Sequence, residues 1–107
     1  MIYVDPLVSW GWKLRGRTVK SCHLFCDQLD LDELHTMAAR IGMKRSWFQD
    51  HRLLPHYDLT ASRRALAVSL GVVEVGRDEA VRLWRARRAL TLGTLPPVVG
   101  KLEFPPL

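Results

Sequence analysis

The sequence predicts a small three-layer α/β domain, in which three helices cover a mainly parallel sheet of about four strands. Its 107 residues are enough for one domain with a core of its own. Hydrophobic residues make up 48% of the chain and charged residues 25%, which is the balance of a globular protein. From residue 22 onward, short β-forming runs alternate with segments of helical periodicity. This order is typical of parallel strands joined by right-handed crossovers.

Short runs that contain β-forming residues mark the predicted strands. The first run ends at Asp5-Pro6, because proline disfavours continuation of a strand. Its direction within the sheet stays open. Residues 6–20 and 52–59 contain glycine, proline or clustered polar residues, and we predict loops there. The predicted strands are 2–4, 22–26, 44–48 and 72–75.

Three segments have the spacing and the terminal residues of helices. Asp30 and Glu33 have the form of a capping box, and Gly42 stands where a helix commonly ends. Thr60 is a suitable N-cap residue for the second helix. The third begins with acidic residues, which the helix dipole favours. The predicted helices are 31–41, 61–70 and 77–90.

The last residues differ in kind from the rest of the chain. We divide the sequence into one α/β domain over residues 1–90 and an extended arm over residues 91–107. The arm contains four of the six prolines together with seven apolar side chains. Such an arm is expected to pack on a protein surface, because its apolar side chains would otherwise contact water. We expect an exchange of arms that makes a homodimer; docking of the arm on its own domain is the alternative.

The chain is basic, and its charge is uneven. The formal net charge is +5. Residues 1–60 carry eight basic and seven acidic side chains, whereas residues 61–107 carry eight basic and four acidic ones. The longest nearly apolar run, residues 65–73, is far shorter than the roughly 20 residues of a spanning helix. No secretory signal is visible at the N-terminus. We therefore expect a cytoplasmic protein without a membrane partner.

The two cysteines, Cys22 and Cys26, fall in one predicted strand. At that spacing they lie about 13 Å apart on one face, whereas a disulfide needs Cα atoms within about 7 Å. We expect two buried thiols in a reducing compartment. A zinc site built from the cysteines and histidines is the alternative, although the usual spacing of two residues between cysteine ligands is missing.

Several stretches resemble one known family. They are the opening Met1-Ile-Tyr-Val-Asp5, the Ser46-Trp-Phe-Gln49 segment and, most specifically, His56-Tyr-Asp-Leu-Thr-Ala-Ser-Arg-Arg64. Over roughly residues 1–85 the chain resembles a family of small bacterial and phage proteins classified only as a domain of unknown function. The resemblance implies an origin in actinobacteria or their phages. It implies no activity and no catalytic residue.

Polar residues follow the predicted strands and point to a ligand site. In parallel α/β sheets, ligands bind at the carboxyl ends of the strands. Carboxylates beside a histidine there can hold a divalent metal or transfer protons. The helix that begins after Thr60 offers free N–H groups and nearby cations to a phosphate. The candidate catalytic residues are His56, Asp58, Asp5 and Asp27. The candidate ligand-binding residues are Tyr57, Thr60, Ser62, Arg63 and Arg64.

Ordinary structural roles remain open for several of these residues. Asp5 before proline can simply form a turn, and Asp58 can help to cap the following helix. His35 lies at the edge of an apolar stripe, which favours a structural role. His51 is equally consistent with a solvated loop residue.

A second surface combines aromatic and basic residues, the ingredients of nucleic-acid contact. If nucleic acid is the partner, the contact surface is expected to include the predicted loop at residues 6–20 and the predicted helix at 77–90. The alternative is that the tryptophans cover the edge of the core while the arginines are solvated. The candidate nucleic-acid residues are Trp10, Trp12, Lys13, Arg15, Arg17, Arg82 and Arg85.

Together these patterns predict a domain that binds a phosphate-bearing ligand, either a nucleotide or a nucleic acid, at the strand edge. Its enzymatic form is a metal-assisted phosphoesterase with a divalent metal as cofactor. The sequence leaves open whether the chain is an enzyme. The alternative is a non-catalytic interaction module, of phage origin, that acts on a host protein.

Overall fold

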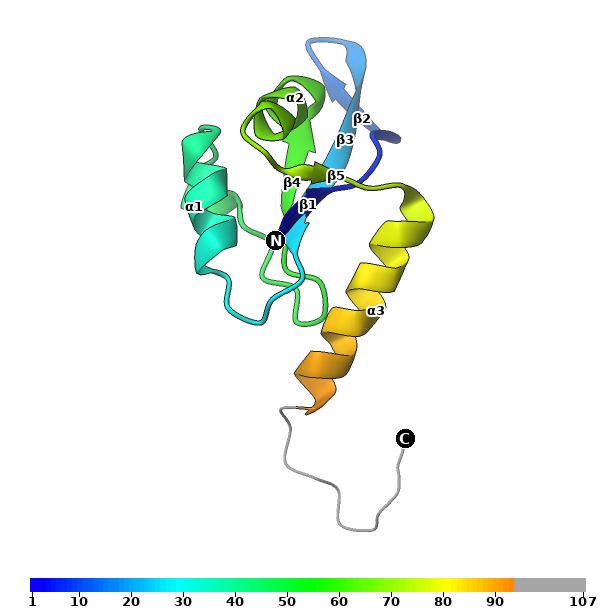
Figure 1. Cartoon of the computed structure of the whole chain (residues 1–107). Helices are drawn as coiled ribbons and strands as arrows, with labels where there is room; N and C mark the ends of the chain where they lie inside the picture. The colour runs from blue at the N-terminus through cyan, green and yellow to red at the C-terminus, as the bar shows by residue number, and fades with distance from the viewer. Residues whose placement is uncertain (94–107) are drawn as a thin grey trace.

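Five strands form one mixed sheet between two helical layers in the computed structural model, which describes residues 1–93 (Figure 1). The strands are β1 (Ile2–Val4), β2 (Val8–Leu14), β3 (Arg17–Cys26), β4 (Tyr57–Thr60) and β5 (Val73–Glu74). The helices are α1 (Asp32–Arg40), the short 3₁₀ helix η1 (Arg45–Trp47), α2 (Ala61–Ser69) and α3 (Arg77–Gly93).

The long strand β3 organises the sheet. It pairs antiparallel with β1 and β2 on one edge and antiparallel with β4 on the other. Among the described residues, β1 and β5 make the one parallel pair. The prediction of a mainly parallel sheet is therefore wrong. The reason is a two-residue turn at Arg15 and Gly16, both with positive φ (53° and 78°), which sends β3 straight back along β2. A connection this short allows only antiparallel neighbours.

The predicted loop at residues 6–20 is in fact this hairpin, formed by β2 and the first part of β3. In sequence, apolar residues alternate with other residues along 8–14, which is a strand pattern. Gly11 obscures it, because glycine usually weakens a strand. Here Gly11 has a φ of 82° and lies where the register shifts between Ser9 and Lys13, as in a β-bulge.

Two further segments differ from the predicted secondary structure. Residues 44–48, predicted as a strand, contain the 3₁₀ turn η1, and the predicted loop at 52–59 ends in β4. β4 is a real but short strand, in which Tyr57 and Leu59 are buried while Asp58 and Thr60 are only partly buried. A strand of four residues directly before a helix offers too short an alternation to be recognised from sequence.

The three predicted helices are confirmed, with shifted ends. α1 ends before Gly42, whose φ of 82° suits a glycine there. α2 ends one residue earlier than predicted, and α3 runs three residues further. The Thr60 hydroxyl does not cap α2; it lies 3.3 Å from the Ser62 hydroxyl instead.

Alternating residues of β1 and β3 supply two separate cores. On one face, Val4 and Leu24 pack with residues of α1 and α2 into the larger core. On the other face, Tyr3 and Phe25 stack with ring centroids 5.6 Å apart and pack against Ala80 of α3. His23 lies two residues before Phe25 in β3, so its side chain is on the α3 face of the sheet.

Both cysteines are free and buried, as predicted. Burial raises the pKa of the Cys22 thiol to about 12, which leaves it un-ionised. Cys22 and Cys26 belong to the core on the α1 and α2 face, whereas His23 is on the opposite face. The arrangement therefore gives no support to a zinc site that joins the cysteines to this histidine.

No helix within residues 1–93 is both long and apolar enough to cross a membrane. Most of the predicted arm, residues 94–107, lies outside the described residues. The predicted exchange of arms and the alternative of docking on the same domain therefore stay predictions.

Arg64 of α2 joins three elements and provides a test of the fold. Its Nε donates to the backbone oxygen of Asp5 at the end of β1 (2.9 Å), and its Nη1 lies 2.9 Å from the carboxylate of Glu74 in β5. We expect Arg64→Met to lower the free energy of unfolding by about 1.5–3 kcal/mol, because a charged hydrogen bond and a half-buried anchor are lost.

Urea denaturation measures this change, and Glu74→Gln is the matched control. Because the Glu74 side chain is 57% exposed, removing its charge is expected to cost only about 0–1 kcal/mol. Equal losses in the two variants would show that the bond from Arg64 to β1 does not stabilise the fold.

Candidate functional site

Four polar side chains meet around His23 on the α3 face of the sheet. His23 and Asp58 are direct partners in the β3–β4 pairing, so their side chains are neighbours on one face. His56 lies immediately before β4, and Asp5 lies immediately after β1. We call these four residues the His23 group.

Asp5 holds His23 with both oxygens of its carboxylate. One oxygen accepts the backbone N–H of His23 (2.6 Å), and the other lies 2.7 Å from its Nδ1. Asp5 is only 6% exposed. An ionised carboxylate can only accept, so Nδ1 carries the hydrogen and Nε2 is the nitrogen for coordination. The bond to Asp5 raises the pKa of His23 above its ordinary value, although burial opposes the shift.

His56 is oriented in the same way by the backbone. Its Nδ1 lies 2.7 Å from the oxygen of Leu54, which can only accept, so Nδ1 is the donor. Its Nε2 lies 3.5 Å from the carboxylate of Asp58. The ring meets that of His23 edge to face, with centroids 4.8 Å apart. Burial lowers the pKa of His56, which favours the neutral ring that metals bind.

The arrangement fits a metal ion. One ligand atom from each of His23, His56 and Asp58 lies within 4.8 Å of the others. Bonds of about 2.0–2.2 Å to a tetrahedral ion place two ligands about 3.4 Å apart. The 3.5 Å between His56 and Asp58 matches that separation and is too long for a good hydrogen bond. In metalloproteins, coordinating histidines commonly donate their other N–H to a carboxylate or a backbone carbonyl, as both histidines do here.

Two cavities adjoin the His23 group. One, of about 260 Å³, lies between the sheet and α3, and we call it the α3 cavity. His23 and Asp5 form part of its wall, together with Trp84 from α3. The other cavity, of about 460 Å³, touches Asp58 and is lined by Trp47 and other residues near η1 and α2.

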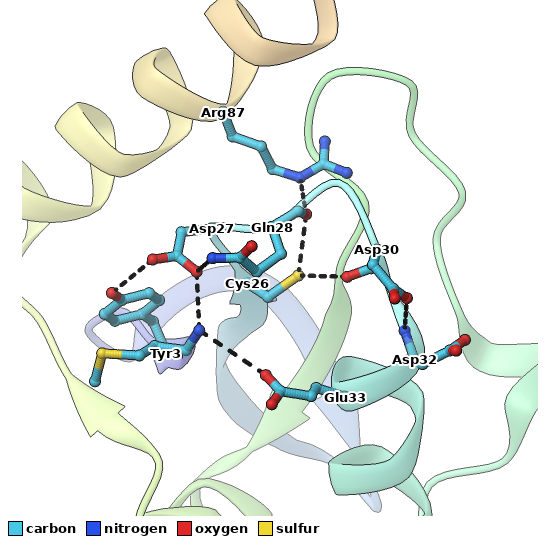
Figure 2. Close-up of polar contacts among 9 residues, drawn as sticks. Tyr3, Cys26, Asp27, Gln28, Asp30, Asp32, Glu33 and Arg87 are labelled. Atoms are coloured by element: carbon cyan, nitrogen blue, oxygen red, sulfur yellow. Dashed lines mark hydrogen bonds and ion pairs between the residues drawn. The ribbon is translucent and has the colours of Figure 1, made fainter.

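Of the four candidate catalytic residues, the structure brings together Asp5, His56 and Asp58. Asp27 lies elsewhere, because β3 runs antiparallel to β1 and therefore ends at the other end of the sheet. There Asp27 accepts a hydrogen bond from the Tyr3 hydroxyl (3.1 Å), as Figure 2 shows. In the same region Arg87 of α3 donates to the backbone oxygen of Gln28 (2.9 Å), which ties α3 to the loop after β3 (Figure 2).

The candidate ligand-binding residues are spread over the other face and the edge of the sheet. Tyr57 is buried in the core of the α1 and α2 face, where its hydroxyl lies 2.8 Å from Nδ1 of His35. This contact gives His35 a structural partner. Thr60 lines the cavity beside Asp58, and Ser62 is exposed at the start of α2.

The two candidate arginines lie at the edges of the His23 group: Arg63 shares a cavity with Asp58, and Arg64 contacts the backbone oxygen of Asp5. Arg63 lines the cavity near η1, where its Nη1 donates to the backbone oxygen of Ile41 (2.9 Å) and its guanidinium lies over the Trp47 ring. Arg64 is bound to the end of β1 and to β5, as described above. From the sequence we expect the candidate residues to share one pocket; in the structure Arg63 lines a cavity with Asp58, whereas Asp5 lines the other cavity.

The candidate nucleic-acid residues fall on two separate elements. Trp10, Trp12 and Lys13 belong to β2, and Arg15 lies in the turn. The side chains of Lys13, Arg15 and Arg17 are exposed. Figure 1 shows this hairpin at the top of the molecule, whereas α3 runs down toward the bottom. On α3, Arg82 forms an ion pair with Glu79, and Arg85 is exposed.

His23 and Trp84 belong to the site although the sequence patterns did not mark them as site residues. One signal for His23 was present, since it is the polar residue in an otherwise apolar strand segment, Cys22-His-Leu-Phe-Cys26. Trp84 had no local signal. Its ring packs edge to face on His23 and on Phe25, with centroids 5.7 and 5.6 Å away.

Comparison with known proteins identifies a family. Residues 2–87 match a family described as "Protein of unknown function (DUF4031)". This range contains the whole sheet and every member of the His23 group. No curated protein and no solved structure matches the chain.

The pairing of Asp5 with His23 has a measurable effect on pH dependence. A raised pKa in the folded state means that the pair stabilises the fold fully below the ordinary pKa of histidine, about 6.5. This stabilisation is lost as the pH rises through the raised pKa. We expect Asp5→Asn to lower the pKa of His23 and to destabilise the metal-free chain more at pH 5.5 than at pH 9.

Nuclear magnetic resonance titration of the histidine rings in the presence of a chelator measures the pKa, with His23→Gln used to assign the signal. Asp27→Asn, at the other end of the sheet, is the control and is expected to leave the pKa of His23 unchanged. An unchanged pKa in Asp5→Asn would contradict the role given to Asp5.

Proposed function

The chain belongs to the DUF4031 family of proteins of unknown function, and we propose that it binds a divalent transition-metal ion through His23, His56 and Asp58 and uses it to hydrolyse a phosphate ester. One observation carries the proposal. The two histidines and one carboxylate converge, and an oxygen acceptor holds the remote nitrogen of each ring.

The ligand set supports a metal better than a structural hydrogen-bond network. His56 donates from Nδ1 to Leu54, and its Nε2 faces the carboxylate of Asp58 at 3.5 Å. On a neutral ring that nitrogen carries a lone pair, so two electron-rich atoms face each other. A cation between them removes this repulsion. Two imidazoles and a carboxylate suit zinc and the neighbouring first-row metals.

The number of ligands supports catalysis. Three protein ligands leave a coordination position for water, as in catalytic zinc sites. Such an ion, when bound, would lower the pKa of a coordinated water to about 7 and would polarise a phosphoryl oxygen. Hydrolysis then consumes one water: its oxygen forms a bond to phosphorus, the bond from phosphorus to the alcohol oxygen breaks, and the alcohol leaves with a proton.

Charge favours an anionic substrate. The chain has a formal net charge of +5. Arg77, at the start of α3, lines the same cavity as His23, which places a cation near the metal ligands. A guanidinium recognises a phosphate group well.

Isothermal titration of the full chain with Zn²⁺, and separately with Mn²⁺, tests the metal site. We expect one ion per chain. His56→Gln is expected to weaken binding by more than the roughly 10- to 100-fold that loss of a supporting partner costs, and Asp5→Asn by about that amount. His51→Gln is the matched control, because His51 is exposed and outside the group.

Turnover is measured with p-nitrophenyl phosphate, before and after chelation and after the metal is restored. Activity that follows the metal content supports the proposal. Equal metal affinity in His56→Gln and His51→Gln would refute the site. Metal binding without turnover of any phosphate ester would favour the alternative of a non-catalytic binding module.

A second candidate function, nucleic-acid binding, is favoured by the β2–β3 hairpin. A two-stranded ribbon is a known way to contact a nucleic-acid groove, and this one exposes Lys13, Arg15 and Arg17. We expect Arg15→Glu with Arg17→Glu to weaken binding of a short DNA duplex and to flatten its salt dependence. Fluorescence anisotropy measures both quantities.

The comparison variant is Arg82→Glu with Arg85→Glu on α3. A larger loss in this variant would move the contact surface to α3. No binding by the unchanged protein at low salt would exclude nucleic acid as a partner of either surface.

A further inference from the structure

We propose that the α3 cavity holds the apolar part of the substrate, and that the substrate is a small phosphate ester of an alcohol that carries a flat ring. This inference rests on the proposed function, because it places the ester group at the His23 group. It goes further in naming what lies on the other side of the scissile bond.

The α3 cavity lies directly beside the proposed metal site. His23 belongs both to the metal-binding residues and to the cavity wall, and its partner Asp5 is also part of the wall. A molecule in the cavity therefore lies beside His23, one of the three residues proposed to hold the ion. The cavity lies on the same face of the sheet as the Tyr3, Phe25 and Ala80 core.

The wall of the α3 cavity is mostly apolar. Apart from the His23 group and Arg77 the wall is apolar, and its larger members are Pro6, Val8, Leu54, Val81 and Trp84. Its volume is about 260 Å³. A cavity of about 150 Å³ with apolar walls can hold a benzene molecule. The α3 cavity therefore has room for one ring with a substituent, but it is too small for a nucleic-acid strand.

Trp84 gives the cavity an aromatic wall. Its ring is held in place by contacts with His23 and Phe25. Because Trp84 is part of the cavity wall and aromatic rings pack favourably on one another, the wall favours an occupant with a flat ring. Arg77 provides the cation for the phosphate of the same molecule.

The test compares two esters of simple primary alcohols, benzyl phosphate and ethyl phosphate, which differ in the ring. Each is titrated calorimetrically into the zinc-loaded full chain. We expect benzyl phosphate to bind about tenfold more tightly or better, because its ring leaves water for an apolar cavity. Val81→Phe fills the cavity and is expected to abolish this preference while zinc affinity stays unchanged.

Ala86→Phe is the matched control, because it adds the same ring at an exposed position of α3. It is expected to keep the preference for benzyl phosphate. Equal affinity for the two esters, or a preference that survives Val81→Phe, overturns the cavity inference while leaving zinc binding and turnover intact. Exclusive binding of a single-stranded oligonucleotide overturns it as well.

The proposed function can fail separately. If the chain binds no zinc, the same titrations are made with the metal-free protein. A preference for benzyl phosphate that Val81→Phe abolishes there keeps the cavity as a ligand site and removes the metal. Absence of the preference in both forms refutes the inference.

Discussion

The two-residue turn at Arg15 and Gly16 is the constraint on which the sheet and the site both depend. Both residues adopt positive φ, and the turn returns the chain along β2. β3 consequently runs antiparallel to β1, which brings the end of β1 beside the middle of β3. At that point Asp5 meets His23 and binds both its backbone and its ring. A crossover connection would have placed these two residues at different positions along the sheet.

The His23 group shows how a polar cluster is kept in place on a largely apolar sheet. Buried polar groups cost free energy unless they are hydrogen-bonded. Asp5 satisfies His23, and the Leu54 backbone satisfies His56, so each ring has one fixed orientation. The gap between His56 and Asp58 is the feature that these hydrogen bonds leave unexplained. A shared cation explains it, and the same hydrogen bonds then become the supports of a metal site.

The two faces of the sheet differ in how completely apolar side chains fill them. α1 and α2 cover the larger core, in which Leu24 and Tyr57 are almost completely buried. α3 covers a smaller one, where the small Ala80 allows close approach to Tyr3 and Phe25. One turn further along, the bulky Trp84 contacts His23, and the α3 cavity lies beside them. The less filled face is thus the one that carries the polar group and its cavity, whereas the filled face stabilises the fold.

Local patterns in the sequence determined the three helices, because each has several turns of amphipathic spacing and a glycine or an acidic first turn at its ends. They also marked Asp5, His56 and Asp58 as polar residues beside strands. The hairpin pattern at residues 8–14 was present in the sequence but was masked by Gly11.

Only the tertiary structure decided the direction of β3, the inclusion of His23 and Trp84, and the separation of Asp27 from the other carboxylates. The physical reason is distance along the chain. Asp5 and His23 are 18 residues apart, and the pairing of His23 with Asp58 spans a still longer segment. Such contacts depend on which strands become neighbours and in which direction they run. No property of a short segment encodes either of these choices.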